Sequence, residues 1–464
     1  MAMKTPRKVF REYDIRGVAE TDLSDELTHA LGRALATFLA KEGRSAQVAV
    51  CRDCRLSSDR LFAALTAGLM ASGAHVIDVG VGPSPLLYFS AHHLETDGAV
   101  MITGSHNPPE DNGFKMMRGK GTLFGADIQT LRRIIEEERF AEGEGSMSKQ
   151  DPREAYVSAV KKASHITPGE VTRIVVDAGN GAAGPLAIRT LEALGIEIEP
   201  LFCDMDGRFP NHHPDPTVED NLAALRTKVA EVGAPLGIAY DGDGDRIGVV
   251  DDEGDVIWGD KLMVLFSREV LAEHPGAAII GEVKCSQTLY DDIADKGGRP
   301  IVNKTGHSLI KKRMKDEGAL LAGEMSGHIF FADRYFGFDD AIYASARLVE
   351  LVGKHGRAPR ELLSDLPETF VTPELRVICP DEIKFDVVSE VLDRYRATHE
   401  VLDVDGARID FGDGAWGLCR ASNTGPVLVL RFEAKSAARR DAIRAEVEAI
   451  VTEAREKLER GATA

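Results

Sequence analysis

Residues 236–246 read LGIAYDGDGDR, in which an apolar run typical of a buried β-strand passes directly into a polar, glycine-rich loop. The stretches GAVMITGSHN (98–107) and ALLAGEMSGH (319–328) repeat the pattern. Each is the third apolar run of a set of three, and segments with helical patterning separate the runs. The six remaining runs cover 47–53, 73–80, 172–179, 195–203, 277–284 and 299–305. The sequence therefore predicts three diverged copies of one structural unit.

Strands that alternate with helices predict an α/β fold with βαβ units and mostly parallel strands. Loops at the carboxyl ends of such strands bind ligands, so three equivalent loops predict three mixed α/β sheet domains around one cleft. The rest of the chain has short, closely spaced strands and a long charged helix, which predicts an α+β domain. The expected domains are I at 1–150, II at 151–254, III at 255–368 and IV at 369–464.

Composition excludes several classes of protein. The 464 residues carry 56 Lys and Arg against 75 Asp and Glu, a net charge of −19, which disfavours binding to nucleic acid. No apolar run approaches the roughly 18 residues of a membrane span, and the charged N-terminus is not a secretory signal. Six scattered cysteines do not form a disulfide framework, and the pair Cys51 and Cys54 is interpreted as structural. We expect a reduced, cytoplasmic protein.

The DGDGDR loop predicts a metal site. Asp241, Asp243 and Asp245 alternate with glycines that let the backbone turn tightly, and three carboxylates this close repel each other unless a divalent cation lies among them. An EF-hand is excluded because Arg246 stands at loop position six, Asp252 stands at position twelve and a strand precedes the loop. Three carboxylates leave room for water and phosphate ligands, as Mg²⁺ prefers.

Ser105 follows the strand of the first unit in TGSHNPPEDNGFK, with His106, Asn107 and Lys115 nearby. The sequence is not G-x-S-x-G, so a hydrolase nucleophile is not supported. Either a phosphate-carrying serine, whose phosphate completes the shell of the metal, or an ordinary turn serine fits these residues.

Two further loops carry groups suited to a sugar phosphate. GEMSGH offers Glu324, Ser326 and His328, which suit sugar hydroxyls and proton transfer. RASNTGP (420–426) offers a guanidinium, hydroxyls and an amide that suit a phosphate. Taken singly, either loop is equally well interpreted as a polar surface loop.

Together these motifs resemble the α-D-phosphohexomutase superfamily, and most of all its bacterial phosphomannomutase/phosphoglucomutase branch. FREYDIRG (10–17), TGSHNPPEDNGFK, DGDGDR, GEMSGH and RASNTGP follow one another in the order of that family. The resemblance implies four domains around a deep cleft and a reversible transfer of phosphate between O6 and O1 of a hexose. It also implies a phosphoserine enzyme, a hexose 1,6-bisphosphate intermediate that acts as activator, and mannose and glucose phosphates as substrates.

The resemblance also implies a role for each motif residue. Ser105 matches the carrier, and together with Asp241, Asp243 and Asp245 it would hold one Mg²⁺ per chain. His106 and Arg246 would steady the phosphoryl oxygens, and both Lys115 and His328 match positions proposed for the general acid and base. The expected substrate-binding residues are Tyr13, Arg16, Lys284, His307, Glu324, Ser326, Arg420, Ser422, Asn423 and Thr424.

Three alternatives remain open at this point. The main activity is a phosphoglucomutase, or the chain is a metal-dependent sugar phosphatase, or it binds a sugar phosphate without catalysis. Each takes a small sugar phosphate as partner, with neither nucleic acid nor membrane. The sequence gives no oligomeric state.

Overall fold

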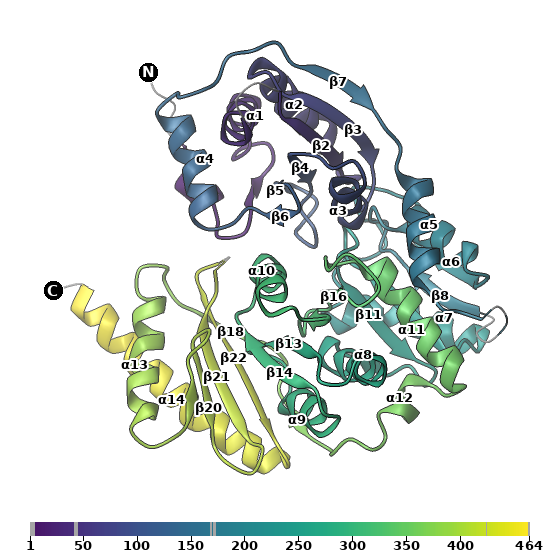
Figure 1. Ribbon diagram of the computed structural model, residues 1–464. Helices are drawn as coiled ribbons and strands as arrows, with labels where there is room; N and C mark the ends of the chain where they lie inside the picture. The colour runs from purple at the N-terminus through teal and green to yellow at the C-terminus, as the bar shows by residue number, and fades with distance from the viewer. Residues whose placement is uncertain (1–4, 41–44, 168, 170–172, 424, 463–464) are drawn as a thin grey trace.

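The computed structural model describes residues 5–40, 45–167, 169, 173–423 and 425–462, which form four sheets (Figure 1). The unit built on each sheet is named here in chain order. The first sheet has the order β1-β5-β4-β2-β3-β7, with β6 paired to β5. Its strands are β1 (Ile15–Val18), β2 (Gln47–Arg52), β3 (His75–Val81), β4 (Gly98–Ile102), β5 (Asp111–Arg118), β6 (Gly121–Thr122) and β7 (Ser146–Lys149). Its helices are α1 (Asp25–Leu39), α2 (Ser58–Ala71), α3 (Ser84–His93) and α4 (Ala126–Glu136).

The second and third sheets have the orders β12-β11-β10-β8-β9 and β14-β13-β15-β16. The second unit contains α5 (Arg153–Ala163), β8 (Arg173–Asp177), α6 (Gly184–Ala193), β9 (Glu197–Leu201), α7 (Ala223–Val232), β10 (Leu236–Tyr240), β11 (Ile247–Asp251) and β12 (Val256–Ile257). The third contains α8 (Gly259–Glu273), β13 (Ala278–Glu282), α9 (Gln287–Asp295), β14 (Arg299–Asn303), α10 (His307–Glu317), β15 (Leu321–Gly323), β16 (Ile329–Phe331), α11 (Ala341–His355) and α12 (Pro359–Leu362).

The predicted repeat is present in the topology of all three sheets. In each sheet, the first strand of the repeat lies between the second and the third strands. The first strand pairs in parallel with both of these neighbours. A fourth strand then returns antiparallel to the third, as β5 on β4, β11 on β10 and β16 on β15. The sheets are therefore mixed, because the polar loops after the third strands are too short for a parallel crossover and close hairpins instead. These three hairpin loops hold Ser105, the three aspartates and Glu324.

One apolar core joins the first three units. It includes Tyr88 of the first unit, Tyr156 and Tyr240 of the second, and Phe266 and Tyr343 of the third, all at most 1% exposed. Strands β4, β10 and β13 are buried along their whole length, as expected for strands covered on both faces. The shared core fixes the three loops relative to one another, because closely packed side chains resist displacement.

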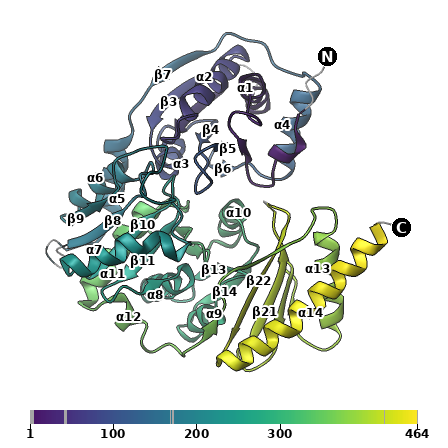
Figure 2. The same cartoon turned by 180° about the vertical axis from the view of Figure 1, so that it is seen from behind.

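The fourth unit has its own sheet and core. Its sheet has the order β17-β22-β21-β20-β19, with β18 also paired to β22, and every pairing is antiparallel. The strands are β17 (Phe370–Val371), β18 (Leu375–Ile378), β19 (Val401–Leu402), β20 (Ala407–Asp410), β21 (Trp416–Ala421) and β22 (Val427–Ala434). Helices α13 (Lys384–Arg396) and α14 (Ala437–Ala462) cover one face (Figure 2), as the α+β prediction requires.

Val283 of the third unit packs against Trp416 and Leu418 of the fourth. This small cluster joins the fourth unit to the rest of the molecule. Among the described residues, no helix combines the length and apolar character needed to cross a bilayer.

Candidate active site

The loops of the first and second units meet at Ser105. Its hydroxyl donates a hydrogen bond to Asp241 Oδ2 at 2.7 Å, and its backbone N–H donates to Thr103 Oγ1 at 2.8 Å. Ser105 has φ +49°, a left-handed conformation that a side-chain-bearing residue adopts only when its surroundings impose it. The side chain is 2% exposed. The loop therefore directs the serine hydroxyl at the aspartate cluster at a conformational cost.

The three aspartates of the β10–β11 loop converge as predicted. Asp241, Asp243 and Asp245 are fully buried, and one carboxylate oxygen of each lies within 4.8 Å of the others. Gly244, at φ +74°, makes the tight turn that brings them together. Burial, together with the charges of Asp243 and Asp245, raises the pKa of Asp241 well above its usual value. Negative charge at this point is costly without a cation.

Lys115 of β5 supplies a positive charge to this cluster. Its Nζ donates to Asp243 Oδ2 and Asp245 Oδ2, each at 2.6 Å, and the residue is 3% exposed. Burial lowers the pKa of Lys115, but the charges of Asp243, Asp245 and Asp241 outweigh burial and raise it. Lys115 thus binds the two carboxylates as an ammonium group.

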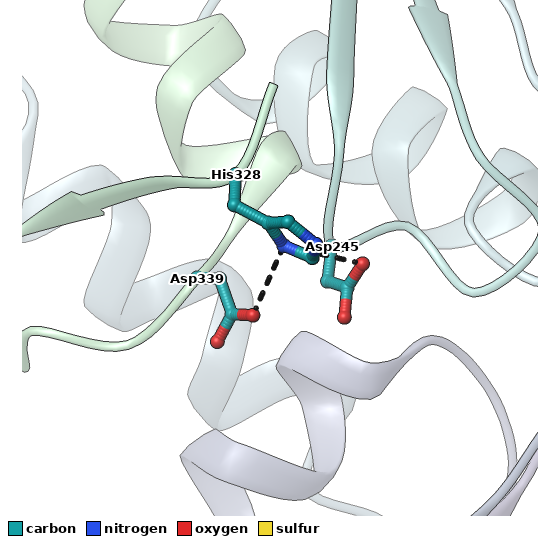
Figure 3. A group of neighbouring side chains, drawn as sticks. All are labelled: Asp245, His328 and Asp339. Atoms are coloured by element: carbon teal, nitrogen blue, oxygen red, sulfur yellow. Dashed lines mark ion pairs between the residues drawn. The ribbon is translucent and has the colours of Figure 1, made fainter. Parts of the chain in front are cut away.

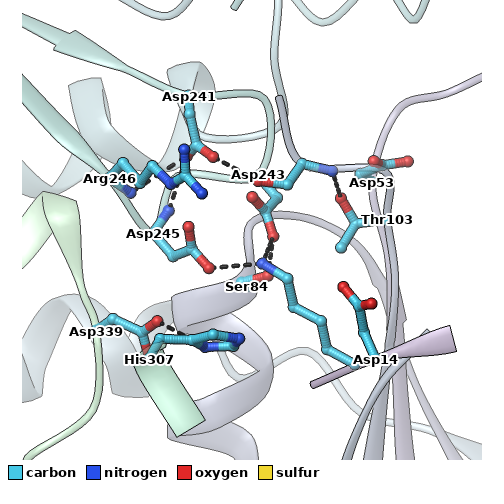
Figure 4. A network of polar contacts seen from close by, with 12 residues as sticks. Asp14, Asp53, Ser84, Thr103, Asp241, Asp243, Asp245, Arg246, His307 and Asp339 are labelled. Atoms are coloured by element: carbon cyan, nitrogen blue, oxygen red, sulfur yellow. Dashed lines mark hydrogen bonds and ion pairs between the residues drawn. The ribbon is translucent and has the colours of Figure 1, made fainter. Parts of the chain in front are cut away.

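The donor set also fits a hard divalent cation. Asp243 Oδ1 and Asp245 Oδ1 are buried and have no hydrogen-bond partner among the described residues, so they are available as ligands. All the donors are oxygens, which Mg²⁺ and Ca²⁺ prefer over softer ligands. Figure 4 shows the three carboxylates directed toward a common region beside Ser84, whose hydroxyl donates to Asp243 Oδ2.

Arg246 and His328 connect the aspartate loop to the third unit. Arg246 Nε donates to His328 Nε2 at 2.9 Å, and the two residues form an isolated antiparallel bridge.

His106 lies next to the serine hydroxyl, with its Nδ1 3.2 Å from the serine oxygen. Burial, and then the charges of Arg246 and Arg16, lower the pKa of His106 well below its usual value. His106 is therefore a neutral hydrogen-bonding group in this environment.

The GEMSGH loop presents a carboxylate at the start of α10. Glu324 Oε1 accepts the N–H of Gly306 at 2.5 Å, and Ser326 donates to Oε2 at 3.3 Å. Burial raises the pKa of Glu324, but the charges of His328 and Lys284 outweigh burial and lower it. An ionised, buried carboxylate suits pairs of sugar hydroxyls as an acceptor.

The FREYDIRG and RASNTGP motifs meet through Tyr13. The Tyr13 hydroxyl donates to Thr305 O at 2.9 Å and accepts from Asn423 Nδ2 at 2.7 Å, so one phenol touches the third and fourth units. Gly306 leaves room for the ring, since a Cβ there would lie 2.7 Å from Tyr13 Cζ. Arg16 Nη1 donates to Asn107 Oδ1 at 2.7 Å, within the serine loop.

The remaining predicted residues lie around these groups. Arg420 Nε donates to Asp405 Oδ2 at 2.9 Å, and Lys284 Nζ lies 3.1 Å from Glu374 Oε2. Ser422 O accepts from Lys384 Nζ at 2.6 Å, and Thr424 lies outside the described residues. Hydrogen bonds and ion pairs thus link motifs from all four units, with Ser105, Lys115, Arg246 and His328 in one network.

Sequence reasoning missed several residues that support this network. Arg55 has a fully buried side chain and donates to Ser105 O and Asn107 O, each at 2.6 Å, as well as to Asp111 O at 2.9 Å and to Pro108 O. Asp53 accepts from Ser58 Oγ at 2.6 Å beside it. An Asp-x-Arg pair at a strand end was the available signal. Cys51, of the same segment, belongs to the shared core.

Four domain models of one protein family match successive parts of the chain. The models for phosphoglucomutase/phosphomannomutase α/β/α domains I, II and III match residues 7–142, 154–254 and 258–370, and the C-terminal domain model matches 374–450. A phosphomannomutase/phosphoglucomutase of Pseudomonas aeruginosa is 47% identical over 431 residues, covering 92% of each chain. A phosphoglucomutase of Neisseria gonorrhoeae is 43% identical over 450 residues, covering 96% of this chain and 97% of the relative.

The solved structures give the same result. A Burkholderia thailandensis phosphoglucomutase/phosphomannomutase family protein matches with a TM-score of 0.90 and 41% identity, covering 97% of this chain and 98% of the other.

Proposed function

Because the chain belongs to the phosphoglucomutase/phosphomannomutase family, we propose that it transfers a phosphoryl group reversibly between O6 and O1 of a hexose phosphate. It is then an isomerase, an intramolecular phosphotransferase. The observation that carries the proposal is the hydrogen bond from the Ser105 hydroxyl to Asp241, within a buried cluster of three aspartates and Lys115. A serine so placed is suited to carry phosphate beside a cation.

In the proposed reaction phosphorylated Ser105 is the donor. The free hydroxyl oxygen of the sugar attacks phosphorus, the bond between phosphorus and Ser105 Oγ breaks, and the hydroxyl proton passes to a base. The product is a hexose 1,6-bisphosphate. This intermediate reverses its orientation in the site and then returns its other phosphoryl group to Ser105. Phosphoryl transfer depends mainly on positioning and charge stabilisation, which Arg246 and the Lys115 cluster supply.

The divalent cation is proposed to be a single Mg²⁺ held by Asp241, Asp243, Asp245 and the oxygen of Ser105. The buried carboxylate oxygens of Asp243 and Asp245 that lack hydrogen bonds support this assignment. When bound, the ion supplies charge neutralisation for the transferred phosphoryl group. The hexose 1,6-bisphosphate serves as activator because it phosphorylates an enzyme that has lost its phosphate.

The remaining residues are proposed to hold the sugar in either orientation. Glu324 and Ser326 bind its secondary hydroxyls, with Lys284 and His307 nearby. The loop of Arg420, Ser422, Asn423 and Thr424 binds the phosphate that does not react. Tyr13 and Arg16 complete the site from the first unit. Lys115 and His328 both stay candidates for the general acid and base.

The decisive experiment compares kcat/KM for mannose 1-phosphate and glucose 1-phosphate, with a catalytic amount of hexose 1,6-bisphosphate present. We expect both 1-phosphates to be converted to 6-phosphates, with mannose favoured or equal. Inorganic phosphate is measured in the same reactions. Release of phosphate without formation of the 6-phosphate would mean a phosphatase and overturn the proposal.

Two broader expectations belong to the same proposal. The domain boundaries are proposed at 150/151, 254/255 and 368/369, and limited proteolysis followed by mass analysis tests them. A reducing cytoplasmic setting is supported by six cysteines that are all free thiols.

A further inference from the structure

Lys384 is a buried lysine that the sequence motifs did not single out. It is the first residue of α13 and is 5% exposed. Its Nζ donates to Ser422 O at 2.6 Å, to Gly425 O at 3.1 Å and to Asp381 Oδ1 at 2.7 Å. An ammonium group has three N–H donors, and these three acceptors account for all of them. The hydrogen bonds of this lysine are therefore made within the fourth unit.

Two of the three acceptors belong to the RASNTGP hairpin loop between β21 and β22. The corner between β18 and α13 also binds this loop through its backbone, since Cys379 N donates to Pro426 O at 2.9 Å. Gly425 O accepts from Val427 N at 2.9 Å as well as from the lysine, which occupies both of its lone pairs. The corner thus binds carbonyl oxygens at both ends of the loop.

Another part of the same loop contacts the first unit. Asn423 Nδ2 donates to the Tyr13 hydroxyl oxygen at 2.7 Å. Arg420, which precedes the loop near the end of β21, donates from Nε to Asp405 Oδ2 at 2.9 Å. The loop therefore lies between α13, inside its own unit, and residues of the first unit that are proposed to line the substrate site.

The direction of the loop carbonyls matters for an anion. Backbone N–H groups in a loop attract a phosphate, whereas carbonyl oxygens are the negative ends of the peptide dipoles and repel it. The carbonyls of Ser422 and Gly425 are bound to the buried ammonium group instead. The side chain of Asp381 is 51% exposed, so solvent screens its charge more than that of the lysine. Both effects favour a phosphate at this loop.

We infer that Lys384 is a positioning residue for phosphate binding: its ammonium group holds the carbonyl oxygens of Ser422 and Gly425 inside the fourth unit, so that the loop presents its donors to the phosphate. The inference rests on the proposed function, in which this loop binds the phosphate that does not react. Within it, Lys384 touches neither the substrate nor the reacting atoms. That phosphate is held equally in the ground state and the transition state, so loss of Lys384 should weaken binding without slowing the transfer.

The first test is the steady-state kinetics of Lys384→Met, which keeps an apolar side chain of similar length but removes the ammonium group. At saturating hexose 1,6-bisphosphate, KM for mannose 1-phosphate should rise about 10- to 100-fold, as expected for loss of hydrogen bonds from a charged group. The value of kcat should change less than about 3-fold. A lower kcat at unchanged KM would mean only that fewer molecules are folded, and it contradicts the inference.

The matched control is Lys457→Met. Lys457 lies on α14 and donates to Glu390 Oε1 of α13 at 2.8 Å, so this variant also removes a lysine that is bound to a carboxylate of the fourth unit. It makes no contact with the RASNTGP loop among the described residues, and we expect KM and kcat to be retained. An equal rise of KM in both variants would show that the contact with the loop is not the cause.

The second test uses the wild type alone. An amine-acylating reagent is applied to the full-length protein with and without saturating mannose 1-phosphate, and mass spectrometry measures the labelling of each lysine. Lys384 should react at least about 10-fold more slowly than Lys457 in both states, because its N–H groups are bound within the fold. Labelling as fast as that of Lys457, or a change of more than about 3-fold on adding the sugar phosphate, overturns the inference. In either case the ammonium group would be free or would bind the phosphate itself.

Failure of this inference is distinguishable from failure of the proposed function. Normal mutase turnover with an unchanged KM in Lys384→Met refutes the inference alone. A wild type without turnover refutes the mutase. Calorimetric titration of the wild type and Lys384→Met with mannose 1-phosphate then still measures whether the lysine supports phosphate binding, and equal affinities refute that role.

Discussion

The hydroxyl oxygen of Ser105 lies 2.7 Å from Asp241 Oδ2, although 136 residues separate the two in the chain. The contact exists because two hairpin loops in equivalent positions of two successive units meet, and the shared core holds the strands that carry them in place. A phosphoryl group on Ser105 would add its negative charge beside three buried carboxylates. We therefore expect both a cation and Lys115 to be needed for catalysis, because opposite charge offsets the repulsion among these groups.

Replacing Ser105 by alanine is expected to remove the phosphate carrier. Intact-mass analysis of the purified wild type should show a fraction heavier by one phosphate, and Ser105→Ala should show none. Mutase kcat should fall by about 10³-fold or more, because the nucleophile is lost. Ser90→Ala is the control, since Ser90 is also buried and its hydroxyl donates to Leu86 O of its own helix. Undiminished turnover in Ser105→Ala would refute the carrier role.

Asp243→Asn is expected to abolish stabilisation by Mg²⁺. In the wild type, Mg²⁺ at 100 times its Kd should stabilise the fold by about 2.7 kcal/mol, seen as a rise in unfolding temperature, and the variant should show little rise. EDTA should lower wild-type turnover by about 100-fold or more, and added Mg²⁺ should restore it. Asp251→Asn, at the far end of β11, should keep the response, because the side chain of Asp251 accepts from the turn amides of Glu253 and Asp255 and lies outside the three-aspartate cluster. Equal responses in both variants would place the cation elsewhere.

Arg55→Ala should release the serine loop. The guanidinium donates to four backbone carbonyls of that loop, and Gly104 lies so close that a Cβ there would be 2.5 Å from Arg55 Cζ. Loss of this clamp should lower kcat by about 100-fold, because a displacement of about 1 Å at a reacting group is this costly. Free guanidinium ion should restore part of the activity. Arg60→Ala, which removes bonds to the carbonyls of Ala19 and Leu23, should keep kcat and show no such rescue.

Stability should depend on pH through Asp340. Burial raises the pKa of Asp340 to about 6, against 3.8 for an ordinary aspartate. The folded state therefore holds the proton more tightly, and this contribution is full below pH 3.8 and is lost as pH rises through about 6. The shift corresponds to about 3 kcal/mol. Asparagine does not titrate, so only the wild type loses this contribution as pH rises. The unfolding temperature of Asp340→Asn should therefore rise relative to that of the wild type between pH 4 and pH 7. A difference between the two proteins that is constant with pH would contradict this.

Tyr13→Phe should weaken the link between the first, third and fourth units. The hydroxyl donates to Thr305 O and accepts from Asn423 Nδ2, and each of these neutral hydrogen bonds is worth about 1 kcal/mol, so loss of both should raise KM by up to about 30-fold. Small-angle scattering with substrate should show compaction in the wild type and less compaction in the variant. Tyr395→Phe, which removes a hydroxyl bonded to Glu446 within the fourth unit, should change neither quantity. An unaltered KM and scattering curve in Tyr13→Phe would remove Tyr13 from the closure.

Much of the fold was predictable because the repeat is local. The apolar runs at 98–103 and 236–240 are strands β4 and β10, and the polar loops after them hold the predicted groups. The return strands β5, β11 and β16 make the sheets mixed, and the mostly parallel expectation underestimated them. Their antiparallel pairing depends on loop closure, which periodicity does not report.

The supporting residues were not predictable from motifs. Arg55 binds carbonyls 50 to 56 positions away. The buried carboxylate of Asp339, in the loop between β16 and α11, lies 3.2 Å from a ring nitrogen of His307 and of His328 (Figure 3). Residue type alone does not distinguish them from the other charged residues of the chain. Their identification needed the burial and the partners that the fold supplies.

Side chains of the fourth unit hold the backbone of the third unit around Lys284. Arg408 donates to Val283 O at 2.5 Å and to Cys285 O at 2.9 Å, Arg431 donates to Lys284 O, and Val283 packs on Trp416. In a hybrid enzyme whose C-terminal unit comes from a relative, the contacts that position this lysine would therefore be changed. Such hybrids should be active only when residues 283–285 and the two arginines are exchanged together. The third and fourth units must therefore match each other at this contact.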